Sequence, residues 1–261
     1  MTDDKYFVGI DVGTSYVKSV IINSHKEILS FFIKRTGTAL VDSSLISFEK
    51  VVSNASISKS DITHITATGF GKNKVNFANT NKTEISSHAK GAYHYFPKRI
   101  TIVDIGGQDT KVIKLDEKGK LVNFKMNRKC AAGTGAFIEE IAYRLDLPLN
   151  KLNSLALKST KNAPLGSFCT VFAKSEILTR IKEGEKVEDL IKSAFESVIR
   201  RVIEMVELEG EIVVTGGLIA HNNIIGEILE RETKKTVFIP PNPQLIGAFG
   251  AALFALESKP K

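Results

Sequence analysis

Apolar residues recur along this chain in two rhythms, and these predict its strands and helices. Short apolar runs bounded by turn residues predict strands, and longer segments with an apolar residue every three or four positions predict helices. Apart from two groups of three consecutive strands, the pattern predicts helices over residues 45–52, 84–96, 134–145, 173–181, 187–208, 220–231 and 243–256, and strands over 62–67, 211–215 and 237–239. Strands and helices thus alternate through both halves, which predicts an α/β fold.

The two groups of three strands form an internal repeat. One copy begins with Val8-Gly9-Ile10-Asp11-Val12-Gly13-Thr14 and the other with Ile102-Val103-Asp104-Ile105-Gly106-Gly107-Gln108. Each copy has an aspartate near the end of its first strand, a glycine two residues later and a lysine seven residues later: Asp11, Gly13 and Lys18, then Asp104, Gly106 and Lys111. Each copy continues into a tight turn and a further strand. The repeat therefore predicts a duplicated fold.

The repeat also predicts two lobes, which meet near Pro97. We expect the first lobe over residues 1–97 and the second over 98–242, with the last helix, 243–261, packing on the first lobe. Two β-rich lobes flanked by helices leave a cleft, and a ligand is expected there.

The turn after each aspartate is suited to binding phosphate. Glycine lets backbone N–H groups approach an anion closely, and an aspartate beside bound phosphates can hold Mg²⁺ through water. Lys18 can supply a compensating charge, and Asp104 and Gln108 can order the attacking water. One such turn is weak evidence, because a simple hairpin has the same pattern, but two in matched register are much stronger. The predicted residues of the phosphate turns are Asp11, Gly13, Thr14, Ser15 and Lys18, and Asp104, Gly106, Gly107 and Gln108.

A third glycine-containing turn supports a nucleotide site. Val213-Val214-Thr215-Gly216-Gly217 reads as a buried strand that ends in two glycines before a helix, where adenosine can lie against the backbone. A Walker A loop does not occur in the sequence. A Rossmann fingerprint fails as well, because Ile138 stands where the third glycine after Gly133 and Gly135 would be.

These turns together resemble those of acetate and sugar kinases, heat-shock chaperone ATPases and actin. The resemblance implies the ribonuclease H-like fold of that superfamily (ASKHA), with duplicated βββαβα lobes around an interlobe nucleotide cleft. It also implies ATP or ADP and Mg²⁺ as ligands.

The chain has two cysteines, and both precede predicted helices. Cys130 stands in Lys129-Cys130-Ala131-Ala132-Gly133-Thr134-Gly135, and Cys169 stands in Cys169-Thr170-Val171-Phe172-Ala173. The positive end of a helix dipole favours thiolate, which is the metal-binding form. A [4Fe–4S] cluster takes four thiolates, so two chains related by a two-fold axis can share one. Zinc bound by the same four thiolates, a redox disulfide, two inert thiols and no metal remain as alternatives.

A second resemblance bears on these alternatives. The cysteine motifs, the phosphate turns and Thr215-Gly216-Gly217 are similar to those of the activator component of 2-hydroxyacyl-CoA dehydratases, in the family that includes the ATP-binding subunits of benzoyl-CoA reductases. Further matching pieces are Ala67-Thr68-Gly69 and the stretch 84–92. The resemblance implies a homodimer with one bridging [4Fe–4S] cluster held by Cys130 and Cys169 of each chain, with Gly133 and Gly135 in the cofactor-binding set.

The same resemblance implies partners. Proteins of this family take an electron from ferredoxin or flavodoxin and pass it, with ATP hydrolysis, to an iron–sulfur dehydratase or reductase. Arg128 departs from the acidic residue expected before Lys129-Cys130. This departure leaves the identity of the cluster ligands unchanged, and we expect it to alter partner docking or the cluster potential. A small-molecule kinase and an ATP-driven scaffold are the competing functions on this fold. A kinase has no use for two cysteines at helix starts, and the scaffold remains as an alternative.

Composition and charge bear on the partners and the location of the protein. The formal net charge is +7, but the lysines are scattered without interleaved aromatics, so we expect a solvated basic surface and no nucleic-acid partner. No apolar run reaches the length of a membrane span, and no signal-peptide pattern stands at the start, so we expect a cytoplasmic protein without membrane contact. His88 and His94 are interpreted as packing or surface histidines, because a six-residue spacing does not suit a helix-face ligand pair.

Overall fold

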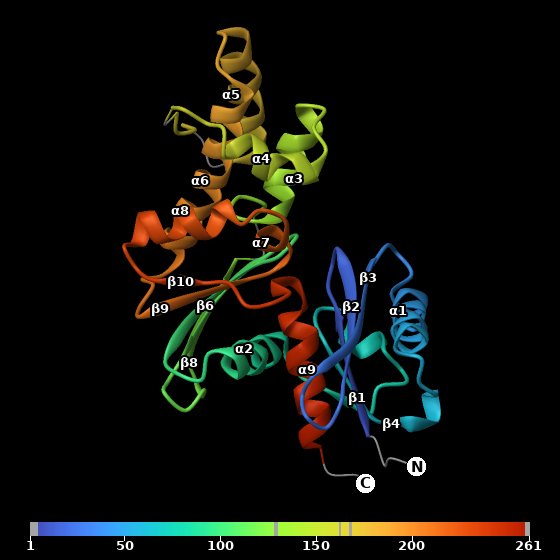
Figure 1. Ribbon diagram of the computed structural model, residues 1–261. Helices are drawn as coiled ribbons and strands as arrows, with labels where there is room; N and C mark the ends of the chain where they lie inside the picture. Colours follow the sequence, from blue (N-terminus) through green and yellow to red (C-terminus); the bar gives the residue numbers. More distant parts are fainter. Residues whose placement is uncertain (1–4, 128–129, 162, 167–168, 259–261) are drawn as a thin grey trace. The chain divides into compact units, whose positions relative to one another are not determined.

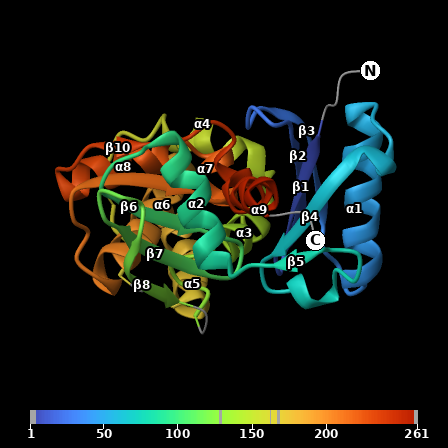
Figure 2. The same ribbon diagram turned by 90° about the horizontal axis from the view of Figure 1, so that it is seen from below.

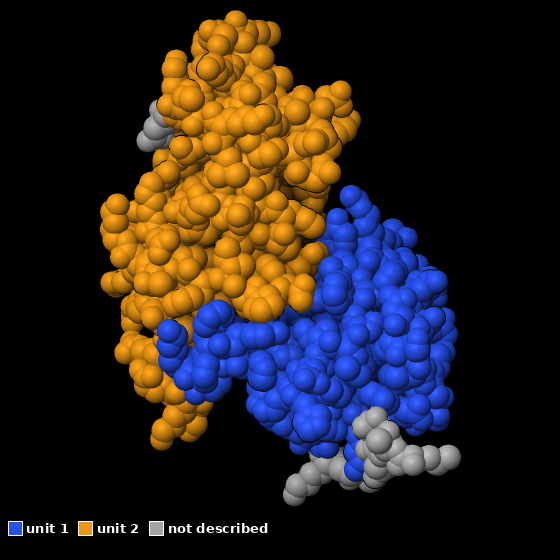
Figure 3. All heavy atoms as spheres, viewed as in Figure 1, with its two compact units in different colours: residues 1–98, 245–261 blue, residues 99–244 orange. Residues whose placement is uncertain are grey.

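The computed structural model describes residues 5–127, 130–161, 163–166 and 169–258, and it divides into two compact units. Unit 1 comprises Met1–Lys98 and Leu245–Lys261, and unit 2 comprises Arg99–Gln244 (Figure 3). Each unit contains a five-stranded mixed sheet that begins with one copy of the internal repeat.

The sheet of unit 1 has the strand order β3-β2-β1-β4-β5. The first three strands are antiparallel, and β4 and β5 continue the sheet in parallel with β1. The strands are β1 (Tyr6–Val12), β2 (Tyr16–Ile22), β3 (Ile28–Arg35), β4 (Ile62–Thr68) and β5 (Thr80–Asn81). The helices are α1 (Leu40–Ala55), α2 (Glu84–Tyr95) and α9 (Ile246–Glu257).

Helices cover both faces of this sheet, as Figures 1 and 2 show. Alternate residues of β1 face opposite sides. Val8, Ile10 and Val12 pack into one core with α1, and Phe7 packs into another with α9. Gly9 allows α9 to cross the sheet closely, because a Cβ there would lie 1.9 Å from the Ala248 carbonyl oxygen. Burial on both faces explains why β1 is apolar along almost its whole length.

The sheet of unit 2 repeats this plan with the order β10-β9-β6-β7-β8. Strands β6, β7 and β8 are antiparallel, and β9 pairs in parallel with β6. The strands are β6 (Ile100–Ile105), β7 (Thr110–Leu115), β8 (Leu121–Asn127), β9 (Glu211–Thr215) and β10 (Val237–Phe238). The helices are α3 (Gly135–Arg144), α4 (Leu152–Ala156), α5 (Thr170–Lys182), α6 (Val187–Met205), α7 (Gly217–His221) and α8 (Ile224–Thr233). One large apolar core joins these helices to the sheet.

The pattern-based prediction of elements is confirmed in outline, including the duplicated group of three strands. The helix predicted over 220–231 is wrong in one respect, because the chain breaks into α7 and α8 at Asn222. The Asn222 side chain donates to the Leu218 carbonyl oxygen at 3.0 Å, and the Asn222 backbone leaves the helical region. An asparagine that bonds to nearby backbone competes with helix continuation. The short elements β5 and α4 were not predicted.

Candidate nucleotide and cluster sites

The first phosphate turn joins β1 to β2 in unit 1. Asp11 pairs with Lys18 across the two strands, and the Lys18 Nζ donates to Asp11 Oδ2 at 2.9 Å. The Asp11 residue is only 2% exposed, whereas the Lys18 side chain is 17% exposed. The Gly13 N–H donates to the Tyr16 carbonyl oxygen at 3.0 Å and closes the turn. Thr14, at the tip, is exposed. The fold therefore brings Asp11, Gly13 and Lys18 together, with Thr14 and Ser15 between them along the chain.

The other carboxylate oxygen of Asp11 has the properties of a ligand-binding atom. Asp11 Oδ1 is buried and has no hydrogen-bond partner. Gly69 borders it, since a Cβ at Gly69 would lie 2.4 Å from this oxygen. A buried polar atom without a partner is costly unless a ligand, ion or water satisfies it. The site therefore suits a hydrated Mg²⁺, which favours carboxylate and water oxygens.

The second phosphate turn joins β6 to β7 in unit 2, and its lysine is held differently. Lys111 Nζ donates to Asp104 Oδ2 at 3.1 Å and to Asp109 Oδ1 at 2.8 Å. The Thr215 hydroxyl donates to the other oxygen of Asp104 at 3.0 Å. Lys111 is 1% exposed, so its charge is compensated inside the protein rather than offered to a ligand. Gln108 is exposed at the tip of the turn, next to Asp109.

The second turn is bonded directly to the segment that follows Cys130. The Gly135 N–H donates to the Gly106 carbonyl oxygen at 2.9 Å, and the Ala136 N–H donates to the Gly107 carbonyl oxygen at 2.7 Å. The Thr110 hydroxyl donates to the Gly133 carbonyl oxygen at 2.5 Å. The first N–H groups of a helix have no partner within the helix, so α3 satisfies two of them on the phosphate turn.

The third glycine turn lies at the end of β9, beside the second phosphate turn. Gly216 adopts φ 104°, and a Cβ there would lie 2.3 Å from the Ile105 carbonyl oxygen. The Gly216 N–H donates to the Pro243 carbonyl oxygen at 3.0 Å, and Gly217 begins α7. Gly216 is thus needed for close packing against β6, which is a structural reason for glycine at this position.

The two cysteines are both exposed, and neither is part of a disulfide. Cys169 is the residue before the first turn of α5, as the sequence indicated, and its carbonyl oxygen accepts from the Ala173 N–H at 2.8 Å. Cys130 lies five residues before the start of α3, so it is farther from a helix end than predicted. The Asn127 side chain donates to the Cys130 carbonyl oxygen at 3.0 Å and fixes the backbone there. Arg128, singled out in the sequence, lies outside the described residues.

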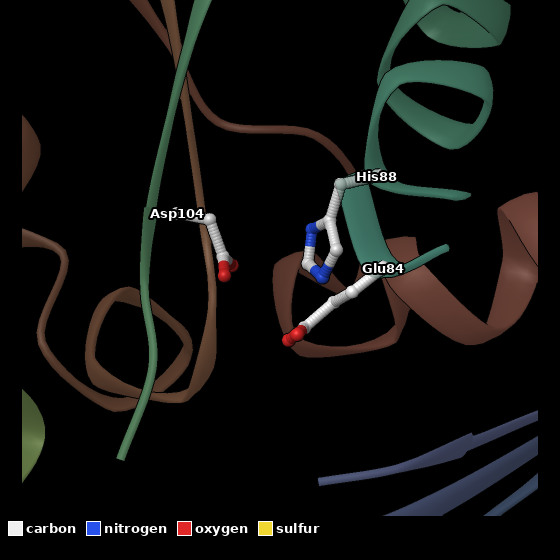
Figure 4. A group of neighbouring side chains, drawn as sticks. All are labelled: Glu84, His88 and Asp104. Atoms are coloured by element: carbon white, nitrogen blue, oxygen red, sulfur yellow. The ribbon is translucent and has the colours of Figure 1, made fainter. Parts of the chain in front are cut away.

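Sequence reasoning missed residues that the fold brings to these turns. In unit 2, Asp109 and Thr215 complete the bonds around Asp104 and Lys111; both stand in recognised motifs, but their spacing gave them no role. In unit 1, His88 is buried, and its sequence interpretation as a packing histidine omitted its proximity to Asp11. Figure 4 shows Glu84 and His88 projecting from α2, and it also labels Asp104 of β6. A carboxylate oxygen of Glu84 and a ring nitrogen of His88 lie within 4.8 Å of each other.

The fold is shared with proteins of known structure. A glucokinase of the ROK family from Streptomyces griseus superposes with a TM-score of 0.61 at 14% identity, covering 97% of this chain and all of that one. Component A of the (R)-2-hydroxyglutaryl-CoA dehydratase of Acidaminococcus fermentans superposes with a TM-score of 0.91 at 38% identity, covering 97% of this chain and 98% of that one. The duplicated sheets with their turns thus define a protein of the actin, sugar-kinase and heat-shock-chaperone fold.

The family follows from three further findings. The model of the BadF/BadG/BcrA/BcrD ATPase family matches residues 8–255, so the chain belongs to that family and is an ATPase. The (R)-2-hydroxyglutaryl-CoA dehydratase activating ATPase of Acidaminococcus fermentans is 38% identical over 98% of this chain and 99% of that protein. The activator of the 2-hydroxyisocaproyl-CoA dehydratase from Clostridium difficile, solved with bound ADPNP, superposes with a TM-score of 0.90 at 35% identity, covering 97% of this chain and 94% of that one.

None of the helices in the described part of the chain is long and apolar enough to cross a membrane.

Proposed function

We propose that this protein is an ATP-dependent electron-transfer activator. In this proposal two copies of the chain share one [4Fe–4S] cluster, and ATP hydrolysis accompanies delivery of a low-potential electron to an iron–sulfur dehydratase or reductase. The similarity to dehydratase activators supports the class of partner. The observation that carries the proposal is the direct hydrogen bonding of the second phosphate turn to the start of α3. This bonding joins a proposed nucleotide-binding turn to residues 130–136, which begin with Cys130 and are called the cysteine segment below.

The phosphate turns carry the ATPase part of the proposal. Asp11 would hold the hydrated Mg²⁺ of MgATP through its buried, unpartnered oxygen, and the backbone N–H groups around Gly13 would bind phosphate. In the second turn, Asp104 is fixed by Lys111 and Thr215, so its carboxylate is preorganised to order the attacking water with Gln108. Gly216 and Gly217 border the adenosine.

The two cysteines fit the cluster by their chemistry and exposure. Thiolates are the usual protein ligands of iron–sulfur clusters, and each chain offers two exposed cysteines outside any disulfide. Cys130 and Cys169 of two chains together would supply the four ligands. When bound, the cluster supplies a one-electron carrier. Val171 and Phe172, beside Cys169, are 68% and 67% exposed, so this end of unit 2 presents apolar surface suited to a protein contact.

Coupling runs through the chain's own backbone. A change in the Gly106–Gly107 turn on nucleotide binding or hydrolysis alters the acceptors of the Gly135 and Ala136 N–H groups. The start of α3 must follow, and Cys130 lies five residues before it. Nucleotide states that favour different positions of the turn therefore favour different positions of Cys130.

The proposal also includes an electron donor and an electron acceptor. Ferredoxin or flavodoxin would reduce the dimer in the cytoplasm, and the dehydratase or reductase would accept the electron. The basic surface of the chain, with a formal net charge of +7, suits an acidic electron donor.

The test is anaerobic purification followed by reconstitution with iron and sulfide. We expect a brown homodimer with about four irons per dimer, and ATP hydrolysis that accompanies reduction of the partner. A colourless monomer that still hydrolyses ATP would contradict the electron-transfer proposal and favour a kinase or scaffold. Zinc at about one per dimer, with no iron taken up, would contradict the cluster assignment.

A further inference from the structure

A buried histidine of helix α2 lies close to the aspartate of the first phosphate turn. His88 lies on α2 and is only 4% exposed. Its neighbour is Gly247, in the first turn of α9, where a Cβ would lie 2.8 Å from His88 Nε2. The same Cβ would lie 3.2 Å from Asp11 Oδ2. The His88 ring and the Asp11 carboxylate therefore both lie next to the position that a side chain of residue 247 would occupy.

Two unpartnered polar atoms give an independent indication of a ligand here. Asp11 Oδ1 and the Thr68 hydroxyl are both buried without a hydrogen-bond partner. Asp11 and Thr68 are paired in the parallel register of β1 and β4, so their side chains point to the same face of the sheet. Two adjacent orphaned polar groups in a folded core indicate that a polar species satisfies them.

Charge favours a cation in this position. Asp11 supplies a carboxylate, and Glu84 adds a second one close to the His88 ring, within 4.8 Å. Lys18 already donates to Asp11 Oδ2, which leaves Oδ1 for the ligand. An imidazole nitrogen can contact a metal-bound water or the metal itself.

We propose that α2 completes the divalent-cation site of the ATPase: Asp11 and Thr68 bind the hydrated cation, and His88 positions it. The inference rests on the proposed function, because the cation is the one that accompanies ATP. Glu84 stabilises the arrangement through its charge. Gly247 is required because any side chain there would occupy the face on which Asp11 and His88 converge. His88 is thus a positioning residue that acts on the cation bound at Asp11.

The experiment measures Mn²⁺ binding by the loss of the free-ion signal in electron paramagnetic resonance, with and without a non-hydrolysable ATP analogue. His88→Gln removes the imidazole. Gly247→Ala keeps His88 but fills the converging face, and alanine favours the helix. His94→Gln is the matched control, since His94 lies exposed on the same helix. We expect the dissociation constant for Mn²⁺ to rise about tenfold in His88→Gln and Gly247→Ala, and to stay unchanged in His94→Gln.

The steady-state kinetics provide a second readout. The metal concentration for half-maximal ATPase should rise in both site variants, and saturating metal should restore most of kcat, which a general loss of structure would not allow. Wild-type Mn²⁺ affinity in a folded His88→Gln protein would overturn the inference; if that variant does not fold, wild-type affinity in Gly247→Ala would do so. Failure of the wild-type protein to bind nucleotide at all would instead contradict the proposed function, so the two failures are distinguishable.

Discussion

The two phosphate turns share a sequence pattern, yet their lysines are in opposite situations. Lys18 is partly exposed and bonds to one carboxylate oxygen, and the other oxygen of that aspartate is left without a partner. Lys111 is fully buried and bonds to two carboxylates, and both oxygens of Asp104 accept hydrogen bonds. The aspartate of the first turn therefore has an oxygen without a protein partner, whereas both oxygens of the aspartate in the second turn are held by protein groups.

Two positions explain the difference. Tyr16 and Val17 of the first turn correspond to Asp109 and Thr110 of the second. Asp109 compensates the buried lysine, and the Thr110 hydroxyl reaches the Gly133 carbonyl oxygen. In the first copy of the repeat these positions leave one aspartate oxygen without a partner, and in the second copy they hold the lysine and bond the segment that follows Cys130.

The largest expected effect concerns the two cysteines, of which Cys130 begins the segment that is bonded to the second turn. Cys130→Ala or Cys169→Ala removes two of the four proposed ligands from a dimer, so we expect complete loss of bound iron. ATP hydrolysis should persist, because the phosphate turns use other residues. Iron analysis and ATPase assays on the anaerobically reconstituted variants check both points. Wild-type iron content in both variants would exclude a cluster held by these thiolates.

Next in size is the effect of the two aspartates on turnover. Asp11→Asn and Asp104→Asn should each lower kcat by about 100-fold, equivalent to about 2.7 kcal/mol of transition-state stabilisation. The cluster should remain assembled in both. Excess Mn²⁺ should partly restore Asp11→Asn but not Asp104→Asn, because we assign only Asp11 to the cation. If excess Mn²⁺ restored kcat equally in the two variants, the assignment of the cation to Asp11 alone would be wrong.

The lysines should differ in their effect on stability. Lys111→Met leaves two carboxylates beside each other without their cation, and we expect a loss of about 3–5 kcal/mol in the free energy of unfolding. Lys18→Met leaves one carboxylate, with access to solvent through a partly exposed site, and about 1–3 kcal/mol should be lost. Urea unfolding followed by circular dichroism measures both. A larger loss of unfolding free energy in Lys18→Met than in Lys111→Met would contradict the prediction that the buried Lys111 contributes more to stability.

The sequence allowed the prediction of the repeat and most elements because both leave local signals. Strand β9, over Glu211–Thr215, was predicted to its ends, since an apolar run flanked by charge and glycine defines it. Helix α1 begins at Leu40, five residues before its predicted start, because Ser43 and Ser44 are buried in its first turns and disguise the apolar face. Here tertiary contacts override the pattern: the Ser43 hydroxyl donates to the Thr36 carbonyl oxygen at 2.7 Å.

In the candidate sites, too, some residues were predictable from the sequence and others were not. The glycine turns and cysteines were predictable, because glycine and cysteine are informative residue types at fixed spacing. His88 was not, because its relation to Asp11 arises only when α2 and α9 pack on the same face of the sheet of unit 1, across more than seventy residues of sequence. The bonds from α3 to the second turn were likewise hidden, since backbone N–H groups leave no signature in side-chain identity.

The smallest expected effect tests the bond that distinguishes the second turn from the first. Thr110→Val converts this position to its counterpart, Val17, and removes the hydroxyl that donates to the Gly133 carbonyl oxygen. We expect a loss of about 1 kcal/mol in stability, typical of one buried hydrogen bond. We also expect the rate of iron removal by a chelator to respond less to ATP, because the cysteine segment follows the turn less closely. The measurement is the ratio of chelation rates with ATP and with ADP under anaerobic conditions.

Thr101→Val is the matched control for this prediction. Thr101 lies on β6 of the same sheet, and its hydroxyl donates to the Glu209 carbonyl oxygen at 2.6 Å, away from the phosphate turn. The two substitutions remove the same group from equally buried positions, so they should cost similar stability. Only Thr110→Val should reduce the ATP-to-ADP ratio of chelation rates. Equal ratios in the two variants and the wild type, with ATP binding intact, would mean that this hydroxyl carries no coupling and that the Gly135 and Ala136 N–H bonds must carry it alone.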